Sequence, residues 1–280
     1  MRTVLWCDGA LVDPEVASVR WSDHGLTVGD GVFETIELRR GSPFALSRHL
    51  DRLERSCAGL RFAPPSRSDV TTAVDAVARE WGTDGGRLRI TVTTGVGPMG
   101  SERGGSGPTL IVSASPMTVQ TDPTEVLTVP FTRNENGALA GLKTTSYAEN
   151  VVALQMAKEQ GASEAIFGNT AGHLCEGTGS NVFVARDGVL VTPPLDSGCL
   201  AGVTRALLLE ALAAAGSPAI EADVTVAEWP EVDEAFLVST GRHVQPVSHV
   251  DGRPLAACPG PLTAAAARVW ADAFADDLDP

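Results

Sequence analysis

One stretch of the sequence combines residue types that could carry amine chemistry. Residues 141–150 contain Lys143, one of only two lysines in the chain, and Tyr147, the only tyrosine. The residues that follow, 151–157, have a mainly apolar helical pattern, so Lys143 is expected just before a helix. A lysine that loses its proton in a semi-apolar place becomes a nucleophile. Taken alone, a lysine at a helix start is more often a solvated surface residue than a nucleophile. The choice between the two therefore depends on the other motifs in the chain.

Two further motifs lie in the C-terminal half: an acidic residue before a strand and a helix start that could bind a phosphate. Glu176 opens the run Glu-Gly-Thr-Gly-Ser-Asn-Val-Phe, which leads into a strand pattern. The glycine-containing stretch 198–205 leads into a helix predicted over 206–215, and a helix start binds anions through its free N–H groups and dipole. A lysine nucleophile, an acidic residue on a strand and two places to hold a phosphate match the needs of pyridoxal 5'-phosphate.

The composition of the chain argues against several classes of protein. The formal net charge is −14, with 35 acidic and 21 basic residues, which argues against nucleic acid or an anionic membrane surface as a partner. The five cysteines have no CxxC spacing, so free thiols and no metal site are expected. There is no signal-peptide pattern and no run of 18 apolar residues, which predicts a soluble cytoplasmic protein. The nucleotide-binding, hydrolase-elbow and zinc-protease signatures are missing as well.

The periodicity predicts two domains that mix helices and strands. The periodic spacing of apolar residues is lost after Pro116. We therefore expect a small α/β domain over 1–115, a linker over 116–124 and a larger domain over 125–280 that carries Lys143. Ser47 is expected to cap the first long helix. Strands are predicted at 4–7, 11–12, 32–38, 44–46, 88–94, 109–115, 125–129, 165–167, 182–184, 189–191, 235–242 and 244–250, and helices at 47–60, 70–81, 151–157, 206–215 and 262–274.

The motifs and their order resemble the fold-type IV, class IV aminotransferase-like family of pyridoxal-phosphate enzymes. This family contains branched-chain aminotransferases, D-amino-acid aminotransferases and 4-amino-4-deoxychorismate lyases, and the resemblance runs from Asp8 to about Val250. It implies a two-domain α+β fold whose larger domain is built on a barrel-like sheet. It also implies that Lys143 binds the cofactor as a Schiff base and moves a proton at the substrate carbon. Glu176 would pair with the pyridine nitrogen, and Tyr147 would lie near the phenolic oxygen of the ring.

The resemblance further implies the residues that bind the cofactor phosphate. Arg52, in His-Leu-Asp-Arg-Leu, matches the arginine of the family, and the helix start at Val203 and Thr204 would add backbone N–H groups and a hydroxyl. Thr240 matches a third phosphate contact. Members of the family are usually homodimers, so we expect a homodimer by analogy.

The sequence also favours one activity within the family. Residues 29–35 and 143–147 look most like the lyase members, which would release pyruvate and 4-aminobenzoate in folate biosynthesis through an external aldimine and proton abstraction by Lys143. Arg89, on a predicted strand, is the first candidate for holding a carboxylate of the small anionic substrate, with Thr35 beside the Phe-Glu motif; Arg103 and Arg242 are weaker candidates. The alternatives are an aminotransferase of D- or branched-chain amino acids and a non-catalytic binding scaffold.

Overall fold

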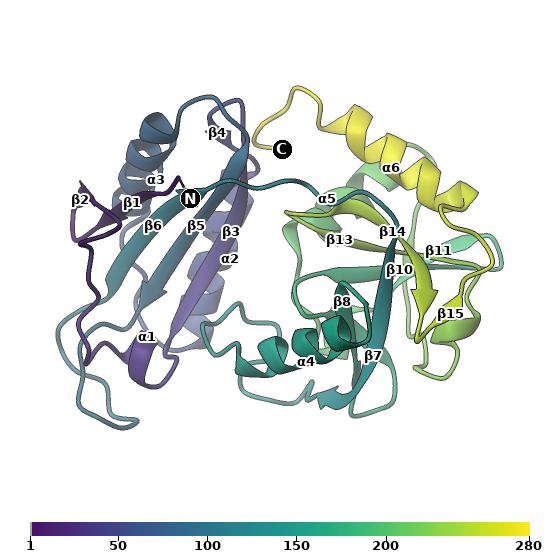
Figure 1. Ribbon diagram of the computed structural model, residues 1–280, viewed down its shortest axis with the longest axis horizontal. Coiled ribbons are helices and arrows are strands. Elements are labelled where there is room, and N and C mark those ends of the chain that lie inside the picture. The colour runs from purple at the N-terminus through teal and green to yellow at the C-terminus, as the bar shows by residue number, and fades with distance from the viewer. Residues whose placement is uncertain (1) are drawn as a thin grey trace. The chain divides into compact units, whose positions relative to one another are not determined.

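The computed structural model describes residues 2–280, which form two compact units (Figure 1). The first unit contains residues 2–118, 142–147 and 278–280, and the second contains residues 119–141 and 148–277. The expected combination of two domains with helices and sheets is confirmed. The division expected from the sequence put Lys143 in the C-terminal part, whereas the contacts of residues 142–147 group this segment with the first unit.

The first unit is built on a six-stranded antiparallel sheet with the order β2-β1-β6-β5-β3-β4. Its strands are β1 (Val4–Cys7), β2 (Ala10–Val12), β3 (Gly31–Arg39), β4 (Ser42–Pro43), β5 (Gly86–Thr93) and β6 (Thr109–Ser115). Its helices are α1 (His24–Thr27), α2 (Leu46–Gly59) and α3 (Arg67–Trp81).

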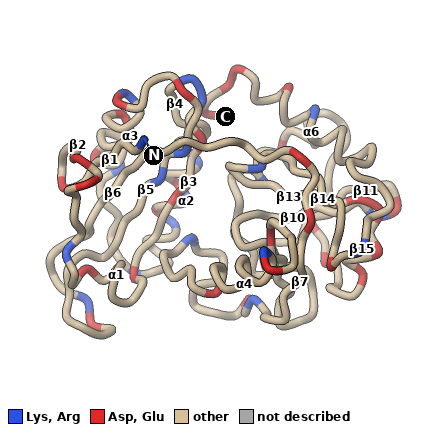
Figure 2. Tube along the Cα trace, in the orientation of Figure 1, with Lys and Arg blue, Asp and Glu red and all other residues tan. Residues whose placement is uncertain are grey.

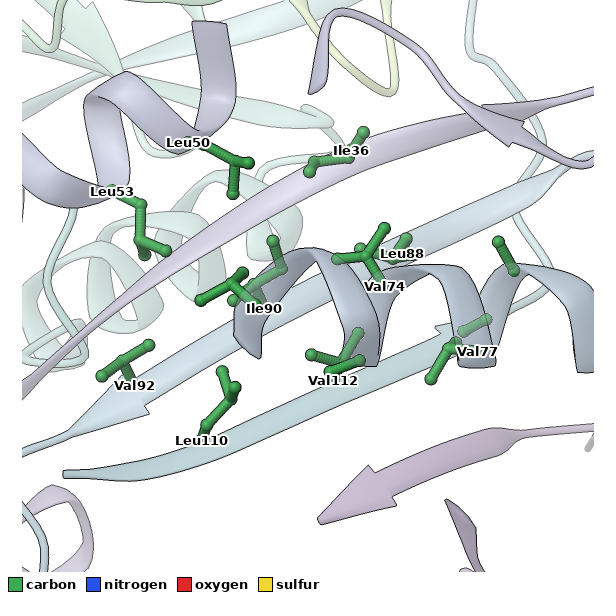
Figure 3. Packing of buried hydrophobic residues seen from close by; sticks show 14 of the residues in the cluster. Ile36, Leu50, Leu53, Val74, Val77, Leu88, Ile90, Val92, Leu110 and Val112 are labelled. Atoms are coloured by element: carbon green, nitrogen blue, oxygen red, sulfur yellow. The ribbon is translucent and has the colours of Figure 1, made fainter. Parts of the chain in front are cut away.

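One face of this sheet packs against α2 and α3. Side chains alternate between the two faces of a strand, and the even-numbered residues of β3, β5 and β6 point to the helices. Leu88, Ile90 and Val92 of β5 are fully buried there, and Figure 3 shows them meeting Leu53 of α2 and Val74 of α3. The odd-numbered residues therefore lie on the opposite, helix-free face.

The start of α2 differs from the sequence-based expectation. The segment 44–46 was predicted as a strand and Ser47 as the helix cap, but α2 begins at Leu46 after Ala45, which has a left-handed backbone and no capping side chain. The Ser47 hydroxyl and N–H instead donate hydrogen bonds to the Asp279 carboxylate, 2.5 and 2.9 Å away. This contact spans most of the chain, so local sequence does not reveal it.

The second unit is built on a nine-stranded mixed sheet with the order β12-β11-β10-β13-β14-β7-β8-β9, and β15 pairs with β14. The strands are β7 (Thr124–Arg133), β8 (Glu164–Asn169), β9 (Leu174–Gly177), β10 (Asn181–Arg186), β11 (Val189–Thr192), β12 (Ile220–Glu221), β13 (Glu234–Ser239), β14 (His243–Val250) and β15 (Arg253–Pro254). The helices are α4 (Ala148–Glu159), α5 (Val203–Ala214) and α6 (Pro261–Ala273), with 3₁₀ turns at Leu195–Ser197 and Trp229–Glu231.

Apolar side chains cover both faces of the second sheet. On one face Val126, Ile166, Val182 and Leu237 form a buried cluster that also contains Trp229. On the other face α4 packs its buried alanines against β7 and β8, including Phe167. Strands that are buried on both sides read as continuous apolar runs, which is why β8, β10 and β13 were recognisable in the sequence.

The distribution of charged residues determines how the protein could bind an anion. Acidic and basic residues are interspersed along both units (Figure 2), with a formal net charge of −14. Any place that binds an anion must therefore act through a local cluster of positive groups. Within residues 2–280, no helix is long and apolar enough to cross a membrane.

Candidate functional site

The segment that carries Lys143 is fixed by backbone pairing with the start of β3. The Phe33 N–H donates to the Lys143 carbonyl over 3.0 Å, and the Thr145 N–H donates to the Gly31 carbonyl over 2.8 Å. The lysine segment thus runs antiparallel to the start of β3, with an isolated bridge between Thr144 and Val32.

Two glycines make this close approach possible. A Cβ at Gly31 would lie 2.8 Å from the Val92 carbonyl oxygen and 3.0 Å from the Thr145 hydroxyl. Gly29 has a φ of +69° and accepts hydrogen bonds from the hydroxyls of Thr145 and Ser146. The glycine-rich turn that the sequence showed before β3 therefore serves both a left-handed turn and the docking of the lysine segment.

The Lys143 amine lies beside aromatic rings. Its Nζ is 4.3 Å from the centroid of the Phe33 ring and 5.8 Å from that of Tyr147. The two rings meet edge to face with centroids 5.2 Å apart. The predicted pair of Lys143 and Tyr147 is therefore brought together, on the face of the sheet that the helices leave uncovered.

Arg89 and Thr35 belong to the same face. They are direct cross-strand partners in the pairing of β3 with β5, and the Arg89 guanidinium carbon lies 3.8 Å from the Phe33 ring centroid. Its Nε donates to the Thr91 hydroxyl over 3.2 Å, and no carboxylate within residues 2–280 forms an ion pair with it. Burial lowers the pKa of Arg89, so its charge is poorly solvated. An anion beside Arg89 would compensate that cost.

Arg52 lies on the opposite, helix-covered face of β3. Its Nε and Nη2 donate to the two oxygens of Glu34 over 2.8 and 2.6 Å, and Glu34 is fully buried. His49 Nδ1–H donates to the same carboxylate over 2.7 Å. The family resemblance implies that Arg52 binds a phosphate, but nothing in the local sequence reveals this ion pair, which fixes the plane of the guanidinium.

The electrostatics of this buried cluster are strongly coupled. Burial of Glu34 opposes its ionisation, but the charge of Arg52 and the hydrogen bonds from Arg52 and His49 prevail and lower the pKa of Glu34 to about 2. Burial lowers the pKa of His49, which disfavours its charged form. The cluster thus consists of one carboxylate, one guanidinium and one neutral imidazole.

In the second unit, Glu176 and Asn181 hold the same residue of a neighbouring loop. Glu176, on β9, accepts a hydrogen bond from the Leu200 N–H over 2.9 Å. Asn181, at the start of β10, donates from its amide to the Leu200 carbonyl, also over 2.9 Å. Gly202 also lies against Asn181, so closely that a Cβ at this position would be 2.0 Å from the Asn181 amide oxygen. The glycine-rich motif therefore fixes the turn that leads into α5.

The start of α5 presents backbone donors beside this turn. Its N-cap residue is Gly202, and no side chain caps this end of the 12-residue helix. Val203 and Thr204 form its first turn, where N–H groups have no partner within the helix. Thr240 lies two residues beyond Val238, the cross-strand partner of Asn181, and so follows the same end of the sheet. The structure therefore groups Glu176 with the helix start in the second unit, and Lys143, Tyr147, Arg89 and Thr35 in the first.

The two weaker arginine candidates have structural partners instead. Arg103 forms a bidentate ion pair with Asp30 over 2.7 Å and donates to the carbonyls of residues 60 and 61, at the end of α2. Arg242 pairs with Glu164 at 3.4 Å and contacts Ser163. These contacts explain the positions of both arginine side chains without a bound ligand.

Comparison with known proteins identifies relatives over nearly the whole chain. The sequence model of the amino-transferase class IV family matches residues 31–250. A putative branched-chain-amino-acid aminotransferase of Methanocaldococcus jannaschii is 33% identical over 254 residues, which cover 89% of this chain and 88% of that protein. A Mycobacterium tuberculosis protein named bifunctional aminodeoxychorismate lyase / D-amino acid transaminase is 30% identical over 277 residues, covering 91% and 94%.

A solved structure matches the fold equally well. The PLP-bound form of a hypothetical aminotransferase from Mycobacterium tuberculosis superposes with a TM-score of 0.87 at 29% identity, covering 98% of this chain and 100% of that chain. The expected fold-type IV architecture is thereby confirmed.

The buried cluster around Glu34 generates a prediction about acid stability. The pKa of folded Glu34 is about 2 and its ordinary value is 4.5, so the unfolded chain binds a proton between these values that the folded chain does not. The stabilisation is complete above pH 4.5 and is lost as the pH falls toward 2, by on the order of 3 kcal/mol. Glu34→Gln should remove this part of the acid dependence and destabilise the protein by about 3–5 kcal/mol at pH 7, because Arg52 stays buried without its partner.

Urea unfolding at a series of pH values tests this expectation. Glu54→Gln is the control, since Glu54 lies on α2 in an exposed ion pair with Arg67 and should cost at most about 1 kcal/mol. Equal losses in the two variants would contradict the assigned role of Glu34.

Proposed function

Because the chain belongs to the class IV aminotransferases, enzymes that use pyridoxal 5'-phosphate, we propose that it transfers the amino group of a branched-chain or D-amino acid to a 2-oxo acid. The observation that carries this proposal is the similarity to proteins named as aminotransferases over about nine-tenths of the chain. The lyase activity expected from residues 29–35 and 143–147 has weaker support, because those short motifs do not separate the two activities.

The residues of the chain fit the cofactor. We propose that Lys143 Nζ is its point of covalent attachment, that Glu176 pairs with the ring nitrogen and that Tyr147 contacts the ring oxygen. Arg52, the first turn of α5 at Val203 and Thr204, and the Thr240 hydroxyl would bind its phosphate. An uncapped helix start, a guanidinium and hydroxyls are the donors that a dianionic phosphate requires. When bound, the cofactor supplies an electron sink for the carbanion that forms at the substrate carbon.

Lys143 is suited to move a proton. Its main-chain carbonyl accepts a hydrogen bond from the Phe33 N–H on β3, and its N–H donates to the Ser56 hydroxyl over 3.3 Å, while its Nζ lies over the Phe33 ring. An amine held beside this ring is a candidate general base and general acid for a neighbouring carbon. We propose that the same Nζ removes the proton of the substrate and returns it at the end of the transfer.

Arg89 and Thr35 are the proposed substrate-binding residues. Arg89 is half-buried, has no carboxylate partner within residues 2–280 and contacts the same ring as Lys143. The Arg89 guanidinium would attract an anion to this face. A carboxylate of the amino acid or of the oxo acid bound at Arg89 would be oriented by the Thr35 hydroxyl on the adjacent strand.

A lyase acting on 4-amino-4-deoxychorismate is the second candidate. It is favoured by one observation, the similarity to a Mycobacterium tuberculosis protein whose name combines both activities. Lys143 would serve either reaction, since each needs a proton taken from the substrate.

The two activities are separated by the acceptor that they require. We expect the purified protein with bound cofactor to convert an aliphatic amino acid and 2-oxoglutarate to the corresponding 2-oxo acid and glutamate, assayed for both leucine and D-alanine. Incubation with aminodeoxychorismate in the absence of an oxo acid should release little pyruvate. Pyruvate release without amino transfer would reject the aminotransferase proposal in favour of the lyase, and a Lys143→Ala variant should be inactive in both assays.

The role of Arg89 predicts a defect in substrate binding. A charged hydrogen bond to a carboxylate contributes about 1.5–3 kcal/mol, so Arg89→Met should raise the KM for the oxo acid about 10- to 100-fold. Affinity for the cofactor should stay near that of the unmodified protein. Arg87→Met is the matched control, because Arg87 lies on the same face of β5 but is exposed. Similar KM values for the two variants would exclude Arg89 as the carboxylate ligand.

We also propose that the protein is a homodimer. In the second unit α4 exposes Val151 and Val152, whose side chains are 63% and 52% accessible, on the side away from its buried alanines. Val152 and Phe131 line one open pocket. An exposed apolar patch of this kind on a helix is typical of a surface that a second chain covers.

A charge placed on this patch should weaken the dimer. Val152→Glu is expected to shift the molar mass measured by light scattering from that of two chains toward that of one, because burying an unpaired carboxylate is costly. Val189→Glu is the control at another exposed valine, on β11. A single-chain mass for the unmodified protein at micromolar concentration would refute the proposed dimer.

A further inference from the structure

Arg133, the last residue of β7, approaches the carboxylate of Glu176. Its Nε lies 3.5 Å from Glu176 Oε1, and the two side chains are only 16% and 14% exposed. Nothing near Arg133 in the sequence resembles a site motif, so its position beside Glu176 is not evident from the sequence. Only the pairing of β7 with β8, and of β8 with β9, brings it to Glu176.

The guanidinium of Arg133 is held from several sides. Its carbon lies 4.1 Å from the centroid of the Phe167 ring, on β8. Its Nη1 donates to Glu149, and both Nη atoms donate to the Asn150 side-chain oxygen over 3.3 and 3.4 Å. The Asn150 amide in turn donates to the Thr178 carbonyl over 2.6 Å. These contacts fix the plane of the guanidinium from the first turn of α4.

The remaining nitrogen of Arg133, Nε, lies beside Glu176. It is buried, has no hydrogen-bond partner within residues 2–280 and is within ion-pair distance of Oε1. The other oxygen of Glu176 accepts the Leu200 N–H. The two oxygens therefore face different groups, a backbone N–H on one side and a guanidinium on the other.

We propose that Arg133 is a positioning residue for the Glu176 carboxylate. This inference rests on the proposed function, in which Glu176 pairs with the ring nitrogen of the cofactor. A carboxylate that is only 14% exposed is stabilised by a nearby positive charge, and a fixed neighbour holds its rotamer. Arg133 supplies both, while Glu149 and Asn150 prevent the guanidinium from turning away.

A purely structural role for Arg133 predicts different behaviour. In that case Arg133 would serve only to attach the start of α4 to the sheet through Glu149 and Asn150. Loss of the arginine would then lower stability without a specific effect on the cofactor. The two roles are separated by measuring cofactor affinity and stability in the same set of variants.

The test combines Arg133→Met with Glu176→Gln. Cofactor affinity is measured by quenching of intrinsic fluorescence on adding pyridoxal 5'-phosphate to apoprotein, and stability by urea unfolding of the apoprotein. We expect Arg133→Met to weaken affinity at least 10-fold. The double variant should lose little more than Glu176→Gln alone, since both changes remove the same interaction. The pH profile of the long-wavelength absorbance of the bound cofactor should shift in the same direction in both single variants.

Two controls complete the design. Glu149→Gln removes the other carboxylate partner of Arg133 and leaves its contact with Glu176, so cofactor affinity should be retained even where stability falls. Arg133→Lys keeps the charge but loses the planar fork, and we expect an intermediate affinity. This variant also provides the measurement if Arg133→Met does not fold.

The outcomes distinguish the inference from the proposed function. If Glu176→Gln keeps normal affinity and an unchanged absorbance profile, the proposed role of Glu176 fails. If Glu176→Gln is defective while Arg133→Met and Arg133→Lys are normal, the role of Arg133 is overturned and that of Glu176 stands. Additive losses in the double variant would also overturn it, because they indicate independent, structural effects.

Discussion

Two backbone hydrogen bonds between β3 and the lysine segment are the constraint on which the first unit depends. They fix the main chain of Lys143 to a strand whose two faces carry different groups. Glu34 points to the helices and holds Arg52, while Phe33 and Thr35 point the other way, toward Arg89. A strand one residue out of register would exchange these faces and bury the wrong set of charges. The full pairing of β3 with β5 and the ion pair of Glu34 with Arg52 both oppose such a slip.

In the second unit, side chains rather than a strand pairing fix the position of a loop. Leu200 is bonded at its N–H by Glu176 and at its carbonyl by Asn181, so two residues five positions apart hold one loop residue from both sides. The start of α5 follows directly and is oriented by this attachment. In both units the hydrogen bonds that fix the segment use main-chain N–H and carbonyl groups, whose bonds are directional.

Much of this arrangement was predictable from the sequence, for identifiable reasons. The strands buried on both sides, the long helices and the glycine turn before β3 follow from local periodicity and backbone preference. Ser47 was misassigned as a cap because its partner, Asp279, lies at the other end of the chain. The ion pair of Glu34 with Arg52 was missed because an acidic residue in a strand looks solvated until the helix above it is placed. The short motifs at 29–35 and 143–147 do not separate a lyase from an aminotransferase, since the role proposed for Lys143 is the same in both.

The alternation of side chains along β3 has a consequence for how the protein can change. Thr35 and Arg89 are cross-strand neighbours on one face, and the fully buried Glu34 is on the other. A combinatorial library confined to positions 35, 89 and 91 would vary the face that we propose binds the substrate and leave the ion pair of Glu34 with Arg52 on the other face intact. Over evolutionary time the same separation would let new specificities arise by drift on one face, with the cost to folding kept low.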